Sequence, residues 1–382
     1  MNVPTRDTVT ILTHSYLDGY TQNLSRPFGG GLERYVHALC RVIIRMGLQP
    51  VVYQLSYFGA FDTTYNGVRV RGWTYELDNI AVAFETMAES AEGLLLYGSC
   101  IWHPIRYRPG SIGICHGISW DRHDMPRDTK QEVAGIINEA VGQLELIVSV
   151  DSQFLTYCRS VCYFPDPARI ALLPNAVDTE WFTPIAGANA GAGSVPLRVL
   201  FPRRLSFERG IVPMMLLATT ILREYPDVIV EFAGELVEKT PIAIAFRLWL
   251  DSHPHQNRIE QRVYSFEEVR TAYQNADIVV IPTIFSEGTS LACLEAMSCG
   301  VPVVSSNVGG LNDIIVDGLN GLLVPPQSAA LTAAVRTLLD NEALRSSMGH
   351  LARLTALAFD QRKWDSQWMS IIEAQRKKLL RS

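Results

Sequence analysis

Residues 276–303 read ADIVVIPTIFSEGTSLACLEAMSCGVPV and are the most informative part of the chain for its fold class. The run 278–282 is apolar without alternation, which predicts a strand buried on both faces of a parallel sheet. A Gly-Thr-Ser turn follows and leads into an apolar run from Leu291 that predicts a helix. This order of strand, short turn and helix is typical of a βαβ unit.

The turn and the predicted helix start form a candidate anion site. Free backbone N–H groups at a helix start point at one spot, together with the positive end of the helix dipole, and favour a phosphate. Glu287 would lie on the turn, and Glu295 would lie about two turns into the helix. There a carboxylate can accept hydrogen bonds from vicinal sugar hydroxyls, as an acidic residue does in dinucleotide sites.

Apolar runs of this kind recur along the chain and alternate with amphipathic stretches. The predicted strands are residues 8–13, 50–54, 93–97, 112–115, 146–150, 197–201, 228–232, 278–282, 301–305 and 321–324. The predicted helices include residues 31–46, 130–144, 210–224, 266–275, 291–299 and 329–339. Strands that alternate with helices indicate parallel sheets. The Gly- and Ala-rich segment 185–196 splits the chain near its middle and predicts a linker between two doubly wound domains.

The bulk composition fits two globular domains of ordinary size. The chain has 382 residues, of which 48% are hydrophobic and 19% charged, so it can bury substantial cores. A formal net charge of −6 argues against nucleic acid as the main partner. The seven cysteines are an odd number without a Cys-x-x-Cys pair, which favours reduced thiols in a cytoplasmic protein. No apolar run in the sequence reaches the roughly 18 residues of a transmembrane helix.

The region 273–326 resembles a known family. Glu287 and Glu295 stand eight positions apart, as in the E-x7-E motif of the retaining glycosyltransferases of family 4, the glycosyl transferases group 1. Further similar segments are NVGG at 307–310, DII at 313–315 and DGLNGLLVPP at 317–326. One departure is Asn312-Asp313, where the family usually has Pro-Glu. The resemblance implies an α/β protein of the GT-B fold, in which two Rossmann-like, doubly wound domains face each other across a cleft.

The resemblance also implies a role for each domain. Residues 1–184 are expected to form the acceptor-side domain, and residues 197–361 the domain that binds the nucleotide sugar. The linker 185–196 would join them. The C-terminal stretch 362–382 is expected to cross back onto the first domain as a helix.

Three loops resemble the family's donor site. The segment FPRRLSFERG at 201–210 is similar to its G-R-L-x-x-x-K-G loop, which implies that Arg204 and Arg209 neutralise the donor diphosphate, while Arg203 replaces a glycine. The segment GGGLER at 29–34 implies that the amides of Gly30 and Gly31 approach the sugar and phosphate. A His-Gly pair after a predicted strand implies that His116 lies near the transferred sugar.

The expected site therefore has two overlapping sets of residues. The catalytic set is Glu287, His116, Arg204 and Arg209. The donor-binding set is Gly30, Gly31, Arg204, Arg209, Glu287, Gly288, Thr289, Ser290, Leu291 and Glu295.

Aromatic and polar side chains gather in loops expected in the first domain. Aromatic faces pack against the C–H surfaces of sugars, and polar groups bind hydroxyls, so an acceptor site is one interpretation and ordinary loop packing is the other. The acceptor candidates are Trp102, Trp120, Arg122 and His123. The sequence contains no Asp-x-Asp motif, which fits a transferase that needs no metal, since arginines and a helix dipole can replace Mg²⁺ at the diphosphate.

We therefore interpret the chain as a retaining, metal-independent glycosyltransferase without a bound cofactor. The expected donor is a nucleoside diphosphate sugar, either a UDP-sugar or GDP-mannose. The expected acceptor is a glycan, a lipid-linked molecule or a small molecule, as in polysaccharide or glycoconjugate biosynthesis. The alternatives are a catalytically silent GT-B binding protein and a nucleotide-sugar epimerase. The expected location is the cytoplasm, with peripheral contact at the inner face of a membrane left open.

Overall fold

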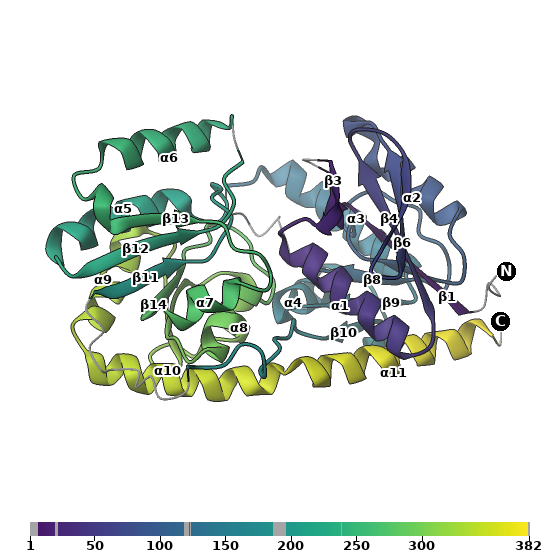
Figure 1. The fold of residues 1–382 in the computed structure, drawn as a ribbon. Helices are drawn as coiled ribbons and strands as arrows, with labels where there is room; N and C mark the ends of the chain where they lie inside the picture. The colour runs from purple at the N-terminus through teal and green to yellow at the C-terminus, as the bar shows by residue number, and fades with distance from the viewer. Residues whose placement is uncertain are drawn as a thin grey trace. The chain divides into compact units, whose positions relative to one another are not determined.

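The contacts of the chain divide it into two compact units. The computed structural model describes residues 7–19, 22–117, 122, 124–185, 196–237 and 239–380 (Figure 1). Unit 1 is Met1–Pro174 with Arg362–Ser382, and unit 2 is Asn175–Gln361. Residues 175–184, which the sequence places in the first domain, belong to unit 2, where the N–H of Val177 donates to the carbonyl of Phe359. Except for Ile185 and Pro196, the predicted linker lies outside the described residues.

Unit 2 is built on a parallel sheet of six strands. In spatial order they are β13 (Ile259–Arg262), β12 (Val228–Ala233), β11 (Leu197–Phe201), β14 (Ile278–Ile281), β15 (Val303–Ser306) and β16 (Gly321–Val324). The helices are α5 (Ile211–Glu224), α6 (Pro241–Ser252), α7 (Val269–Gln274), α8 (Leu291–Ser298), α9 (Ser328–Leu339) and α10 (Glu342–Ala356). From β11 the chain builds the sheet first towards β13 and then, from β14, in the opposite direction. The order of the strands therefore reverses between β11 and β14.

Side chains that alternate along the strands of unit 2 form two separate cores. Val199 and Phe201 of β11 pack in a cluster with α5, α6 and α9. Leu200 between them packs in a second cluster with α7, α8 and α10. Both faces of the sheet are thus covered by helices, which explains why the strands are apolar throughout.

Unit 1 has an eight-stranded sheet. In spatial order its strands are β10 (Ile170–Leu172), β9 (Leu146–Ser149), β8 (Ile112–Cys115), β7 (Leu94–Tyr97), β1 (Thr8–Thr13), β4 (Gln49–Ser56), β6 (Val68–Thr74) and β5 (Phe61–Tyr65). All neighbours pair in parallel except β5 and β6, which form a hairpin at one edge. A separate antiparallel ribbon joins β2 (Leu17–Asp18) and β3 (Asn23–Pro27). Here the strand order reverses between β1 and β7.

The helices of unit 1 come from both ends of the chain. They are α1 (Gly31–Arg45), α2 (Ile80–Glu89), α3 (Arg127–Gln143), α4 (Ser152–Val161) and, at the C-terminus, α11 (Gln361–Leu379), drawn in yellow in Figure 1. The Trp368 indole of α11 is fully buried and donates to the Tyr35 hydroxyl of α1 at 3.0 Å. Gln375 donates to the Gly110 carbonyl at 2.9 Å. These contacts fix the C-terminal residues in unit 1, 333 positions away from Tyr35 along the chain.

Two further expectations concern reduced cysteines and the absence of a transmembrane helix. All seven cysteines are free thiols; Cys162 is half-buried and the other six are buried. Within the described ranges, every helix is either too short or too polar to cross a lipid bilayer.

Candidate functional site

The reversal of strand order in unit 2 brings two loops to one edge of its sheet. β11 and β14 pair in parallel, with Val199 opposite Ile278, so their carboxyl ends lie side by side. The loop after β11 carries the three arginines, and the loop after β14 carries Glu287 and leads into α8. In open α/β sheets, ligands bind at such a reversal, outside the carboxyl ends of the strands.

A cluster of charged side chains occupies this edge. Arg203 Nη2 lies 2.6 Å from Glu287 Oε2, and Arg209 Nη1 lies 2.7 Å from the same oxygen. The Thr283 hydroxyl also donates to Oε2, at 2.9 Å. The side chains of Arg203 and Glu287 are only 9% and 10% exposed, whereas that of Arg209 is 40% exposed. We call Arg203, Arg209 and Glu287 the arginine clasp.

The clasp keeps Glu287 ionised. Burial on its own would raise the pKa of this carboxyl group, but the positive charges of Arg203 and Arg209 outweigh burial and hold the pKa below its ordinary value. Within the described part of the chain, every hydrogen bond to this carboxylate ends on Oε2. Oε1 can therefore accept a hydrogen bond from a hydroxyl of a ligand.

The turn after Glu287 is buried and fixed by side chains. Thr289 and Ser290 are 2% and 1% exposed, and Asn175 donates to the Thr289 carbonyl at 2.6 Å. Ser290 is the N-cap of α8, where its hydroxyl accepts from the Cys293 N–H. Arg203 Nη1 donates to that hydroxyl at 2.8 Å, so one guanidinium connects the helix start with Glu287.

Two glycines support the backbone of this turn. The N–H of Gly310 donates to the Glu287 carbonyl at 2.8 Å. Gly309 has a left-handed φ of +52°, and a Cβ atom there would lie 1.9 Å from the Glu287 carbonyl oxygen. A Cβ at Gly310 would lie 2.6 Å from the Thr289 nitrogen. The predicted NVGG segment therefore has glycines because two backbone segments meet there.

Two further donor-site candidates of unit 2, Arg204 and Glu295, are not part of the clasp. Arg204 is exposed in the same loop as Arg203. Glu295 is only 2% exposed, and its Oε2 accepts a hydrogen bond of 2.8 Å from the Tyr273 hydroxyl of α7. The sequence indicated Arg209, Glu287 and Ser290 but not Arg203, which stood out only as a departure from glycine. The available signal for Arg203 was a charged residue at a position where the resembled loop has glycine.

The reversal of strand order in unit 1 gathers a second set of side chains. His14 follows β1, Ser99 and Cys100 follow β7, and His116 follows β8. His14 Nδ1 lies 2.8 Å from the Ser99 hydroxyl, and Trp102 stacks on the His14 ring with centroids 6.4 Å apart. Cys100 has a left-handed φ of +91°, a strained conformation of the kind that concentrates at ligand-binding edges.

His116 is held in one orientation and one tautomer. Its Nε2 lies 2.8 Å from the Gly98 carbonyl oxygen, and its ring meets the Tyr35 ring edge to face with centroids 4.6 Å apart. Burial lowers the pKa of His116 to about 4, although the bond to Gly98 opposes this shift. The ring is neutral at pH 7, and Nε2 must carry the proton to bond a carbonyl. Nδ1 is then an acceptor for a ligand hydroxyl.

These buried histidines predict a stability loss in acid. Burial, and for His14 also the charge of His103, lowers the pKa of His14 and His116 from 6.5 to about 4. The unfolded chain therefore binds protons more readily, so stability is complete above pH 6.5 and is lost as the pH falls towards 4. For each ring, the loss in the free energy of unfolding reaches roughly 3 kcal/mol, at about 1.4 kcal/mol per pKa unit. The test is thermal unfolding measured at several pH values in this range. The unfolding midpoint of His14→Gln should fall less steeply with falling pH than that of the wild type. An identical slope would contradict the assignment.

The other predicted residues of unit 1 are placed as follows. Gly30 is the N-cap of α1, and Gly31 is the first residue of that helix. Arg122 forms a two-pronged ion pair with Asp124, at 3.0 and 2.9 Å. Trp120 and His123 lie outside the described residues. Of the acceptor candidates that the structure describes, Trp102 thus lies at the edge with His14, and Arg122 is paired with Asp124.

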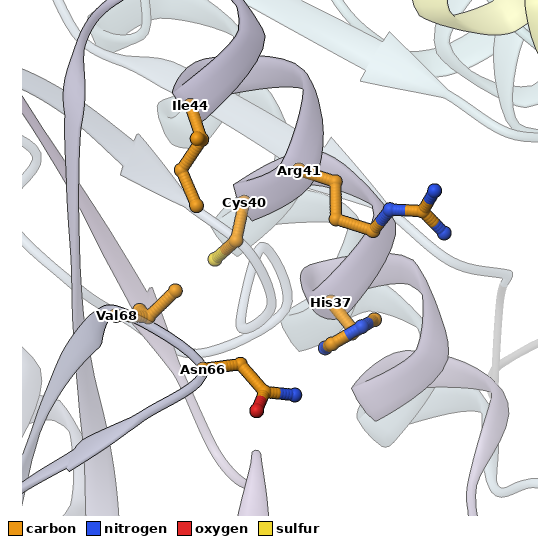
Figure 2. A pocket seen from close by; sticks show the side chains of 6 residues that line it. All are labelled: His37, Cys40, Arg41, Ile44, Asn66 and Val68. Atoms are coloured by element: carbon orange, nitrogen blue, oxygen red, sulfur yellow. The ribbon is translucent and has the colours of Figure 1, made fainter.

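A hollow elsewhere on unit 1 is a weaker candidate. It lies between α1 and the turn of the β5–β6 hairpin, and Figure 2 shows its lining residues, His37, Cys40, Arg41, Ile44, Asn66 and Val68. Its volume is about 290 Å³, just below the roughly 300–1,000 Å³ of typical ligand pockets. The Tyr16 hydroxyl lies 3.1 Å from His37 Nδ1. This partner gives His37 a structural role there.

Among the residues that the structure describes, no group of three or more His, Cys, Asp or Glu side chains is placed to hold a metal ion. The arginines are the cations of the unit 2 site.

A family model and curated relatives both identify this chain as similar to glycosyltransferases. A family described as glycosyl transferases group 1 matches residues 191–355. A D-inositol 3-phosphate glycosyltransferase of Xylanimonas cellulosilytica is 30% identical, over 94% of this chain and 94% of the relative. Across the first curated relatives that it matches, the chain spans about half of their length, between 47% and 54%.

Solved structures share the fold over nearly the whole chain. The sucrose-phosphate synthase of Thermosynechococcus elongatus has a TM-score of 0.76 at 17% identity and covers 99% of this chain and 100% of its own. HepE of Anabaena, solved in complex with UDP-glucose, has a TM-score of 0.70 at 16% identity, with 96% and 99% covered. The expected α/β fold of the GT-B class, with two Rossmann-like domains, is confirmed.

Proposed function

Because the chain belongs to the glycosyl transferases group 1 family, we propose that it transfers a sugar from a nucleoside diphosphate sugar to an acceptor. The observation that carries the proposal is the arginine clasp at the reversal of strand order in unit 2. Arg204 and Arg209 would bind the diphosphate, together with the amides from Gly288 to Leu291 at the start of α8. These groups would stabilise the negative charge that grows on the leaving diphosphate, so no metal ion is required.

The sugar and the ribose would be held by carboxylates and a histidine. In unit 2, Glu287 Oε1 would accept a hydrogen bond from a sugar hydroxyl. Glu295, oriented by Tyr273, would accept hydrogen bonds from the ribose. In unit 1, the neutral Nδ1 of His116 would accept from a ligand hydroxyl, and the amides of Gly30 and Gly31 would donate to the nucleotide sugar.

The proposed stereochemistry is retention. Two guanidinium groups and the Thr283 hydroxyl bond Glu287 Oε2, which withdraws charge from the carboxylate and keeps its pKa low. This makes Glu287 a poor nucleophile. The proposal is therefore a front-face reaction in which the leaving phosphate itself deprotonates the acceptor hydroxyl.

The proposed donor is a UDP-sugar or GDP-mannose. HepE was solved with UDP-glucose, which supports a UDP-sugar without identifying the sugar that this chain uses. The proposed acceptor is a glycan, a lipid-linked molecule or a small molecule bound at the carboxyl edge of unit 1, where Trp102 offers a flat face.

Nucleotide binding tests the donor site through Glu295. A ligand at about 100 times its dissociation constant adds roughly 2.7 kcal/mol of stability, so one of UDP, GDP and ADP should raise the unfolding midpoint of the wild type. Glu295→Ala should lose this shift because the ribose hydroxyls lose their acceptor. Thermal unfolding with each nucleotide is the measurement.

Glu231→Ala is the matched control. Glu231 is also buried, at 3% exposure, and also accepts from a tyrosine hydroxyl, that of Tyr264 at 2.5 Å. This variant should be destabilised but should keep its response to the nucleotide. An undiminished shift in Glu295→Ala would contradict the ribose assignment.

A further inference from the structure

The arginine clasp places two positive charges on one carboxylate oxygen. Arg203 and Arg209 both bond Glu287 Oε2, at 2.6 and 2.7 Å. One negative charge is therefore matched by two guanidinium groups, and the clasp carries a net charge of +1. A single arginine would be enough to satisfy Glu287, so one of the two is in excess.

The two arginines differ in how firmly they are held. Arg203 is 9% exposed and uses two nitrogens on two partners, Glu287 and Ser290. Its backbone is also confined, because a Cβ at Gly234 would lie 1.9 Å from the Arg203 carbonyl oxygen. Arg209 is 40% exposed. Arg203 is thus the more firmly held of the two, and Arg209 is the more exposed.

We propose that Arg203 is a positioning residue that holds the Glu287 carboxylate, so that Arg209 can leave Glu287 and bind the donor diphosphate. This inference rests on the proposed function. If Arg209 were the sole cation on Glu287, its departure would leave a buried carboxylate without a charge partner, which is costly. With Arg203 in place, Arg209 can move to the ligand while Glu287 keeps a partner and its orientation.

Arg203 is separate from Arg204 and Arg209, the pair that the resemblance assigns to the diphosphate. It stands where the resembled loop has glycine. Arg203 would not contact the donor. It would act through Glu287, so its effect on binding should depend on the Glu287 carboxylate.

A double-mutant cycle separates an indirect role from a direct one. Binding of the nucleoside diphosphate that stabilises the wild type would be measured by calorimetry for four proteins: wild type, Arg203→Met, Glu287→Gln and the double variant. In Arg203→Met, Glu287 retains Arg209, so affinity should fall about tenfold, the size of one charged hydrogen bond. In the Glu287→Gln background no carboxylate competes for Arg209, so adding Arg203→Met should change affinity less than about twofold.

Two more variants exclude a general effect of the substitution. Arg203→Lys should recover most of the affinity, because one ammonium still neutralises Glu287 although it cannot also reach Ser290. Arg223→Met removes an arginine that is 69% exposed on α5 and should bind like wild type. Binding of the corresponding nucleoside, which lacks phosphate, should be the same in wild type and Arg203→Met.

The outcomes separate this inference from the function on which it rests. An equal loss of affinity in both backgrounds would show that Arg203 contacts the diphosphate directly and would overturn the inference, as would no loss in either. A wild type that binds none of UDP, GDP and ADP would overturn the proposed function itself, and this inference with it.

Discussion

Glu287→Ala is expected to destabilise unit 2 and to abolish most sugar transfer. Removing one partner of a buried ion pair costs roughly 3–5 kcal/mol, and here two guanidinium groups lose their carboxylate at once. For a unit of this size, a loss of 3 kcal/mol lowers the unfolding midpoint by roughly 6–12 °C. Transfer should fall by about 10²-fold or more, as when a group that positions charge in an active site is removed.

A surface ion pair supplies the control for Glu287. Glu224 on α5 accepts two hydrogen bonds from Arg336, at 2.8 and 2.7 Å, like the carboxylate of the clasp, but this pair lies at the surface. Glu224→Ala should therefore leave both the unfolding midpoint and transfer close to wild type. If Glu287→Ala behaves like Glu224→Ala in both measurements, the clasp is not the core of the site.

Gly309→Ala is expected to lower transfer by about 10²-fold with the donor-site side chains intact, the size of effect caused by a 1 Å misplacement in an active site. The new Cβ would lie 1.9 Å from the Glu287 carbonyl oxygen and 3.0 Å from the Glu287 nitrogen, so the backbone of the turn must move. Both Glu287 and the start of α8 would move with it. The initial rate of nucleoside diphosphate release measures the effect.

Gly318→Ala isolates the cost of the backbone conformation. Gly318 also has a left-handed φ, of +76°, but nothing lies within 4 Å of an added Cβ. This variant meets only the conformational penalty, roughly 1–2 kcal/mol, and should transfer sugar at the wild-type rate. Equal rates in Gly309→Ala and Gly318→Ala would show that the contact with Glu287 does not matter for transfer.

Much of the fold follows from local sequence patterns. β1, β8, β11 and β16 begin and end at the predicted residues. The β5–β6 hairpin was not predicted. β5 alternates between half-buried and exposed residues at the sheet edge, so it lacks the continuous apolar run of the inner strands. The Asn66-Gly67 pair was the available sequence signal for its turn. Both residues have a positive φ in the structure.

The sequence predicted which loops carry the site residues but not which side chains bond one another. Spacing within one loop placed Glu287 before the helix and Ser290 at its start, and both positions are local properties. Which two of the three neighbouring arginines reach Glu287 depends on the path of the loop after β11, which is confined by Gly234, the residue after β12. The bond between Tyr273 of α7 and Glu295 of α8 joins two residues that are 22 positions apart, and no local pattern encodes it.

Sugar transfer itself would show whether this chain is a retaining glycosyltransferase. The protein would be mixed with UDP-sugars and GDP-mannose, with saccharide and lipid-linked acceptors, and the anomeric protons followed by NMR. One donor should be consumed, its nucleoside diphosphate should be released, and the product should keep the anomeric configuration of the donor. Binding of a donor without any turnover, or a product of inverted configuration, would contradict this proposal.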